Sequence, residues 1–232
     1  MNADRAKAIY GEMNWGYERT RIELISLRDT NVILTARVSI LISKFLLHMD
    51  RDVFILSVEN DAEPAGAIRR ALENTGVIPS RIQDAVFGYD GAIPPLNVQR
   101  ITQMAGLTCP AVNVSSSLRA VIFGAQAILS GDLELVFVIG LAEDGSAALL
   151  LASPDAVGRY NLLPRGRIAG RSLSGTDTTL KAAGLASNDV TVTKVGERGV
   201  VLVKEALEEL EQRQAQWGLV SMEQIALLIE RI

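Results

Sequence analysis

Two nearly uninterrupted apolar runs constrain the fold of this chain more than any other feature. Leu133 to Ile139 and Ala147 to Ala152 contain one charged residue between them, Glu134. Runs of this kind, without the polar alternation of a half-exposed strand, are typical of central strands that are covered on both faces of a sheet. The chain is therefore expected to bury a sheet between layers of other structure.

Segments with helical periodicity alternate with further strand-like segments along the chain. The expected strands, besides the two apolar runs, are residues 53–58, 85–88, 110–114 and 167–169. The expected helices are residues 64–75, 98–105, 118–130, a short helix capped by Asp177, residues 200–214, and a last helix with Ser221 and Gln224 as its capping box. The alternation within residues 36–43 suggests a strand, although a helix over residues 33–47 fits nearly as well. This alternation predicts an α/β fold.

Composition excludes several classes of function. The chain has 232 residues, of which 48% are hydrophobic and 22% charged, which favours a large core over a disordered chain. Its net charge of −4 gives no excess of Lys and Arg for binding nucleic acid. The stretch Val32 to Leu47 is interrupted by Arg37 and Lys44 and is short for a membrane span, so no membrane association is expected.

The single cysteine, Cys109, cannot form an internal disulfide, which favours a reducing compartment. The N-terminus has no secretory signal pattern, so a cytoplasmic protein is predicted. Cys109 precedes Pro110 and is interpreted as a buried small hydrophobe. With one cysteine and one histidine, His48, the chain lacks the usual ligands of a zinc site, and we predict no metal and no cofactor.

Three serines, Ser115, Ser116 and Ser117, stand where the helix over 118–130 should begin. One interpretation makes Ser116 an acyl-accepting nucleophile, because a helix N-terminus offers N–H groups and partial positive charge to an oxyanion. A hydroxyl needs a base to take its proton, and nothing in the sequence places His48 beside Ser116. The simpler interpretation, which we favour, is an N-cap that stabilises the helix by about 1 kcal/mol.

The order of several short segments resembles the thiolase superfamily, of the acetyl-CoA acetyltransferase kind. The resemblance covers roughly residues 53–190. Its segments are Asn97-Val98-Gln99-Arg100, Ala105-Gly106-Leu107, Pro110-Ala111-Val112-Asn113, Gly124-Ala125-Gln126-Ala127-Ile128, Gly131-Asp132, Asp144-Gly145-Ser146-Ala147-Ala148-Leu149-Leu150 and Leu163-Pro164-Arg165. In the family the first of these segments lead to the catalytic cysteine, and the later ones re-enter the core after a long loop domain.

This resemblance implies a reduced thiolase-like fold with αβαβα layers. It puts Ser116 at the position of the family's nucleophilic cysteine and makes Asn113, Ser115 and Ser117 candidate ligand-binding residues. The loop domain, which holds much of the family's acyl-CoA site, is missing before Asp144, and the family's other Cys and His motifs are not found. We therefore divide the chain into an N-terminal segment of no assigned role (1–52), a thiolase-like core (53–190) and a C-terminal helical segment (191–232).

The expected function is that of a catalytically impaired thiolase-like protein, a pseudoenzyme. It would bind acyl-CoA or act as a partner subunit of a thiolase-type acyltransferase. Proteins of this family usually pair through the strand before the nucleophile, here Val112 to Val114, so a homodimer or a heterodimer with a thiolase homologue is expected. Two alternatives stay open: an active acyltransferase with Ser116 or Cys109 as nucleophile, and a structural or regulatory module without a ligand.

Overall fold

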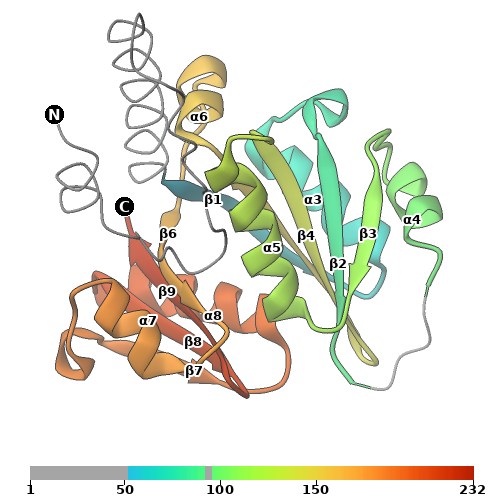
Figure 1. Cartoon of the computed structure of the whole chain (residues 1–232). Coiled ribbons are helices and arrows are strands. Elements are labelled where there is room, and N and C mark those ends of the chain that lie inside the picture. The colour runs from blue at the N-terminus through green and yellow to red at the C-terminus, as the bar shows by residue number, and fades with distance from the viewer. Residues whose placement is uncertain (1–51, 92–95) are drawn as a thin grey trace, which may run out of the picture. The chain divides into compact units, whose positions relative to one another are not determined.

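The computed structural model describes residues 52–91 and 96–232, and it forms one nine-stranded mixed sheet with helices packed against it (Figure 1). His48 and the ambiguous stretch 33–47 lie outside the described residues. The strands are β1 (Val53–Asp61), β2 (Asp84–Tyr89), β3 (Ala111–Val114), β4 (Leu135–Ala142), β5 (Gly145–Ala152), β6 (Gly166–Ser172), β7 (Val192–Val195), β8 (Trp217–Met222) and β9 (Ile225–Arg231). Their order across the sheet is β3-β2-β4-β5-β1-β6-β9-β8-β7.

Most of the predicted helices are present at nearly the predicted places. The helices are α3 (Pro64–Thr75), α4 (Val98–Met104), α5 (Ser117–Ser130), α6 (Pro154–Tyr160), α7 (Thr176–Ala182) and α8 (Gly199–Arg213), with short 3₁₀ turns at Pro79–Arg81 and Ser187–Asp189. α5 ends at Gly131, whose φ of 83° is the left-handed conformation that glycine adopts without a steric cost. The sequence predictions for α3, α4, α5 and α8 are confirmed.

The sheet consists of two halves with the same strand pattern. In the first half, β1 to β5, strands β2 and β4 are parallel and β5 is antiparallel to both β4 and β1. In the second half, β6 to β9, strands β7 and β8 are parallel and β9 is antiparallel to both β8 and β6. The halves join through antiparallel β1 and β6, and the second half has no counterpart of α4 and β3. The two halves therefore repeat one topology.

The two halves enclose a shared central layer of two helices, α5 and α8. One core cluster combines side chains of both helices with side chains of both half-sheets, such as Val138 and Leu227. Alternate residues on β4, such as Phe137, belong instead to a second cluster with α3, and Leu228 belongs to a third with α7. The order of layers is therefore α3, first half-sheet, α5 with α8, second half-sheet, α7, which confirms the predicted αβαβα fold.

The apolar runs noted in the sequence follow directly from this layering. In β4 and β5, successive side chains point in turn to the central helices and to the outer layer. Both faces of each strand are buried, so neither face needs polar residues. In Figure 1, α5 lies along the strands β2 and β4, which it covers on the central side.

The predicted last helix, with Ser221 and Gln224 as a capping box, is wrong. These residues lie in the hairpin of β8 and β9, whose two-residue turn is Glu223 and Gln224. The apolar run of β9 is buried on both faces, and a short run of this kind has no period that separates a strand from a buried helix. Residues 191–232 hold three strands and one helix, so the expected helical segment is corrected as well, while the boundaries of the three parts stay a prediction.

The start of α7 also differs from its prediction. Asp177 was expected to cap this helix, but the N-cap position is Gly175 and Asp177 lies within the first turn. A carboxylate in the first turn is still favourable near the positive end of the helix. α6 has no counterpart among the predicted helices. It begins after Ser153, whose hydroxyl accepts a hydrogen bond from the N–H of Ala156.

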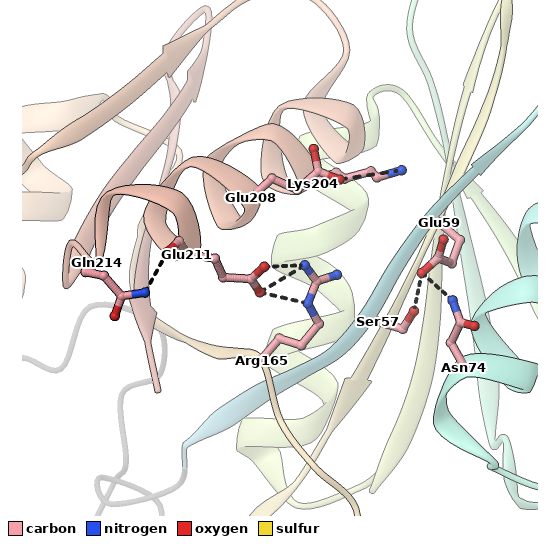
Figure 2. Close-up of polar contacts among 8 residues, drawn as sticks. All are labelled: Ser57, Glu59, Asn74, Arg165, Lys204, Glu208, Glu211 and Gln214. Carbon is pink, nitrogen blue, oxygen red and sulfur yellow. Dashed lines mark hydrogen bonds and ion pairs between the residues drawn. The ribbon is translucent and has the colours of Figure 1, made fainter.

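Polar side chains connect helices α3 and α8 to the middle of the sheet, at β1 and just before β6 (Figure 2). The Arg165 guanidinium, just before β6, donates hydrogen bonds of 3.0 Å to both carboxylate oxygens of Glu211 near the end of α8. Ser57 on β1 and Asn74 on α3 donate to the same oxygen of Glu59, at 3.0 and 2.7 Å. The Arg165–Glu211 pair is partly exposed, and such pairs stabilise a fold by about 1 kcal/mol or less.

Close contact between the two central helices depends on Gly199, the first residue of α8. A Cβ atom at this position would lie 2.5 Å from the backbone nitrogen of Leu118 in α5. Gly88 has the same role on β2, where a Cβ atom would lie 2.3 Å from the carbonyl oxygen of Ser116. Since real Cβ atoms do not approach backbone so closely, the absence of a side chain at Gly199 lets α8 meet α5, and its absence at Gly88 lets α5 lie close to β2.

Gly199→Ala is expected to lower the free energy of unfolding by about 1–3 kcal/mol, because α8 must move away from α5 to admit the methyl group. The measurement is urea denaturation followed by circular dichroism. Gly158→Ala in α6 is the matched control, because no atom lies within 4 Å of its Cβ position. The control should leave stability unchanged or raise it by up to about 1 kcal/mol. Equal urea midpoints for wild type and Gly199→Ala would contradict the close contact.

Candidate functional site at the N-termini of α5 and α8

Ser116 occupies the N-cap position of α5. Its backbone is extended, with φ −157°, and its hydroxyl oxygen accepts a hydrogen bond of 3.2 Å from the N–H of Arg119. The N-cap interpretation of the serine triplet is therefore confirmed. The side chain is half-buried, so the capping bond does not remove Ser116 entirely from solvent.

The other predicted site residues do not gather around Ser116. Ser115 and Asn113 are exposed, and the Asn113 amide oxygen accepts a hydrogen bond of 2.9 Å from the Tyr89 hydroxyl. Ser117 is fully buried. Asn113 and Ser115 thus lie on the outer surface, while Ser117 lies in the interior and presents no surface to a ligand.

The centre of this region is Asp90, which the sequence analysis did not single out. Asp90 directly follows β2, and its carboxylate accepts a hydrogen bond of 2.8 Å from the Ser117 N–H and a second one from the Ser117 hydroxyl. It also accepts a hydrogen bond from the N–H of Gly199 at the start of α8. One carboxylate therefore caps both central helices. The available signal was its place at the carboxyl end of a predicted strand, where helix N-termini gather in α/β folds.

The electrostatics of Asp90 reflect two opposing effects. Burial raises the pKa of its carboxyl above the ordinary value, while the hydrogen bonds from Ser117 and Gly199 and the charge of Arg198 offset part of this shift. The positive ends of two helices stabilise a carboxylate in a place where an unpaired charge would be costly. Val200 completes the network, since its N–H donates to the Ser117 hydroxyl at 3.2 Å.

This network occupies the groups that an oxyanion would need. The N–H groups of Ser117 and Gly199 bind Asp90, that of Val200 binds Ser117, and that of Arg119 binds Ser116. An oxyanion hole requires donors that are free to face the charge that develops in the transition state. Here these four donors are already directed at oxygen atoms of the chain itself.

A histidine base and a reactive thiol are also missing from the described part of the chain. Residues 52–91 and 96–232 include no histidine that could take a proton from Ser116. Cys109 is only 5% exposed, and burial, with the nearby charge of Asp84, raises the pKa of its thiol to about 11. It is therefore protonated at neutral pH and shielded, which confirms the expectation of a buried small hydrophobe.

Beside Asp90 the central layer contains a pocket of about 210 Å³. It opens between the turn that joins β4 to β5 and the first turn of α8, and its polar lining includes Asn60, Asp61, Asp90, Asp144 and Arg198. In this turn Ala142 pairs directly with Gly145, so only Glu143 and Asp144 separate the strands.

The described residues include no set of three His, Cys, Asp or Glu side chains placed to hold a metal ion. Among the helices described between residues 52 and 232, none has the length and apolarity needed to cross a bilayer.

Asp90→Asn should reveal the raised pKa of Asp90 through the pH dependence of stability. A carboxyl whose pKa is raised by folding stabilises the protein at low pH, and this contribution is lost as the pH rises through the folded-state pKa. The free energy of unfolding of wild type minus that of Asp90→Asn should therefore increase as the pH falls from 7 toward about 4, near the ordinary pKa of Asp. Urea denaturation at a series of pH values measures it. A difference that shrinks on acidification would contradict the assignment.

Comparison with known proteins identifies the fold. No family model matches the sequence, and no curated protein matches it. Among solved structures, the chain is similar to the crystal structure of human mitochondrial 3-ketoacyl-CoA thiolase in complex with CoA, with a TM-score of 0.70 and 13% sequence identity. The match covers 78% of this chain and 98% of that chain. At this identity the similarity establishes the fold alone, and it confirms the resemblance found in the sequence. The chain has a thiolase-like fold.

Proposed function

We propose that this chain is a thiolase-like protein without thiolase catalysis, which acts as a partner subunit of a thiolase-type acyltransferase. The observation that carries the proposal is the Asp90 network. A carboxylate of the chain itself fills the junction of the two helix N-termini and binds the N–H groups of Ser117 and Gly199. A cytoplasmic location fits the single cysteine, which is free and buried.

An active acyltransferase is the less favoured alternative. Ser116 would need a general base, and its oxygen already accepts the capping bond from Arg119. Cys109 would need to become exposed and to lose a proton at a pH far below the pKa of about 11 that burial gives its thiol. Catalysis by either residue would therefore require the surroundings of Ser116 or of Cys109 to rearrange.

Binding of acyl-CoA is the second part of the proposal, and the similar human enzyme was solved in complex with CoA. Asn113 and Ser115 are exposed beside the start of α5 and could contact such a ligand. The two-residue turn between β4 and β5 leaves no inserted domain there to cover it. We therefore expect acyl-CoA to bind weakly, and we favour the partner-subunit role over the ligand-binding role.

The edge strand β3 is the surface we propose for pairing, either with a second copy or with a thiolase homologue. It lies at the end of the sheet and is paired with β2 on one side. Val112 is 47% exposed on it, and Asn113 is exposed as well. An unpaired edge with an exposed apolar side chain readily adds a strand from another chain.

For a homodimer, Val112→Lys should weaken self-association at least about tenfold, because two lysine side chains would face each other across the new strand pair. The measurement is sedimentation equilibrium at micromolar concentration. Val195→Lys is the matched control, because Val195 is 73% exposed at the end of β7, the opposite edge strand. It should dimerise like wild type. A wild-type protein that stays monomeric, both alone and when mixed with a thiolase, would contradict the proposal.

Incubation with a labelled acyl-CoA separates the proposal from catalysis. We expect no covalent mass shift in wild type, because the Ser116 hydroxyl oxygen already caps α5, the described residues include no histidine, and Cys109 is a buried thiol. An adduct that is lost in Ser116→Ala or in Cys109→Ala would instead support the acyltransferase.

The melting temperature of the protein with CoA tests whether CoA binds, since a ligand of the folded state raises the melting temperature. No shift at millimolar CoA would favour a structural or regulatory module without a ligand.

A further inference from the structure

Strand β7 has a free edge at a position that the other half of the sheet fills with a strand. Because the two halves repeat one topology, β7 corresponds to β2, and α8 corresponds to α5. In the first half, β3 pairs in parallel with β2 and also contacts α5. The described part of the second half has no counterpart of β3, so β7 pairs with β8 alone (Figure 1). Such an edge offers backbone N–H and C=O groups to a further strand.

An open groove of about 400 Å³ lies between β7 and the second half of α8, where a counterpart of β3 would lie. Its lining consists of one residue of β7 and five of α8: Lys194, Glu205, Glu208, Glu209, Gln212 and Arg213. Val192 and Lys194 face α8, since Val192 packs in the central core and Lys194 pairs with Glu209. Thr193 and Val195 are exposed, as expected for the opposite face of the strand. A strand added to β7 would therefore direct one row of side chains into the groove and the other row beside Val195.

The groove offers negative charge to such a strand. Glu209 already has two cationic partners, one on β7 and one on the next turn of α8. Glu208 has one ion pair, with Lys204 at a long distance of 3.8 Å. Glu205 is exposed and forms no ion pair with any residue of the described part of the chain. A Lys or Arg side chain that enters the groove would thus be attracted, and an acidic one would be repelled.

We propose that β7 and the groove beside α8 bind an extended basic segment of another protein, which adds to the sheet as a further strand. Its backbone pairs with the free edge of β7, its Lys or Arg side chains face Glu205 and Glu208, and its alternate apolar side chains lie beside Val195. In strand additions of this kind the main-chain hydrogen bonds provide affinity and the alternate side chains provide specificity.

A second copy of this chain fits the groove less well. Its own free edge strand, β3, has the sequence Ala-Val-Asn-Val and brings no basic side chain to the two carboxylates. The proposed site also lies at the opposite end of the sheet from β3. It is therefore independent of the pairing through β3 and of acyl-CoA binding.

Isothermal titration calorimetry of the full chain tests the proposal with three synthetic peptides. The first is Ac-Thr-Lys-Val-Lys-Val-Lys-Thr-NH₂, the second has Glu in place of each Lys, and the third is the first peptide with its central backbone nitrogens methylated. The methylated peptide keeps the charges but cannot donate backbone hydrogen bonds to β7. We expect saturable binding of the first peptide alone, with a Kd of about 10–100 μM. Equal affinity for the methylated peptide, tighter binding of the Glu peptide, or no saturable heat from the first peptide up to about 1 mM would overturn the proposal.

Substitution of Glu205 locates the binding site. Glu205→Lys should weaken binding of the first peptide about 3- to 30-fold, because one surface ion pair is replaced by a repulsion of similar size. Glu205→Gln should weaken it about two- to fivefold. Glu73→Lys, at an exposed position of α3, makes the same change in net charge outside the groove and should bind like wild type. Equal weakening by Glu205→Lys and Glu73→Lys, or no weakening by either, would overturn the proposal.

Discussion

The contact between the N-termini of α5 and α8 is the constraint on which the arrangement of the two half-sheets depends. Both helices fill the layer between the half-sheets, so their spacing sets the spacing of everything packed against them. Gly199 permits this approach by having no side chain, and Gly88 likewise lets the start of α5 lie close to β2. Asp90 makes it electrostatically acceptable, because two helix ends of like partial charge would otherwise repel each other. Both the steric fit and the electrostatic fit of α5 against α8 therefore depend on this one contact.

The same contact limits the chemistry of the site. The resemblance to thiolases implies that the start of α5 corresponds to the position of the family's nucleophile. A helix start can stabilise a thiolate or an oxyanion. In this chain that end of the helix carries Ser116 as a cap, and a buried carboxylate lies directly behind it. A fixed negative charge disfavours a second negative charge nearby. The group that holds the core together thus also opposes acyl transfer, which is why we favour assembly over catalysis.

The sequence predicted most of the first half of the fold and much less of the second. α3, α5 and the strands β4 and β5 have clear periodicity or apolar runs with glycine at their ends, so local rules sufficed. Strand β9 was predicted as a helix, because its apolar residues face two different cores and show no polar alternation. The turn before it, Glu223 and Gln224, also lacks the Asn-Gly or Asp-Gly pair that identifies hairpins in a sequence.

The sequence by itself predicted the layered α/β class, a serine cap at the start of α5 and a buried Cys109, because each depends on neighbours within a few residues or on burial that composition predicts. The tertiary structure alone decided the role of Asp90. Its partners, Ser117 and Gly199, are distant from it along the chain and come together only when two helices and a strand end meet. An isolated aspartate after a strand looks like any loop residue, since the long-range contacts that give it a function leave no local pattern in the sequence.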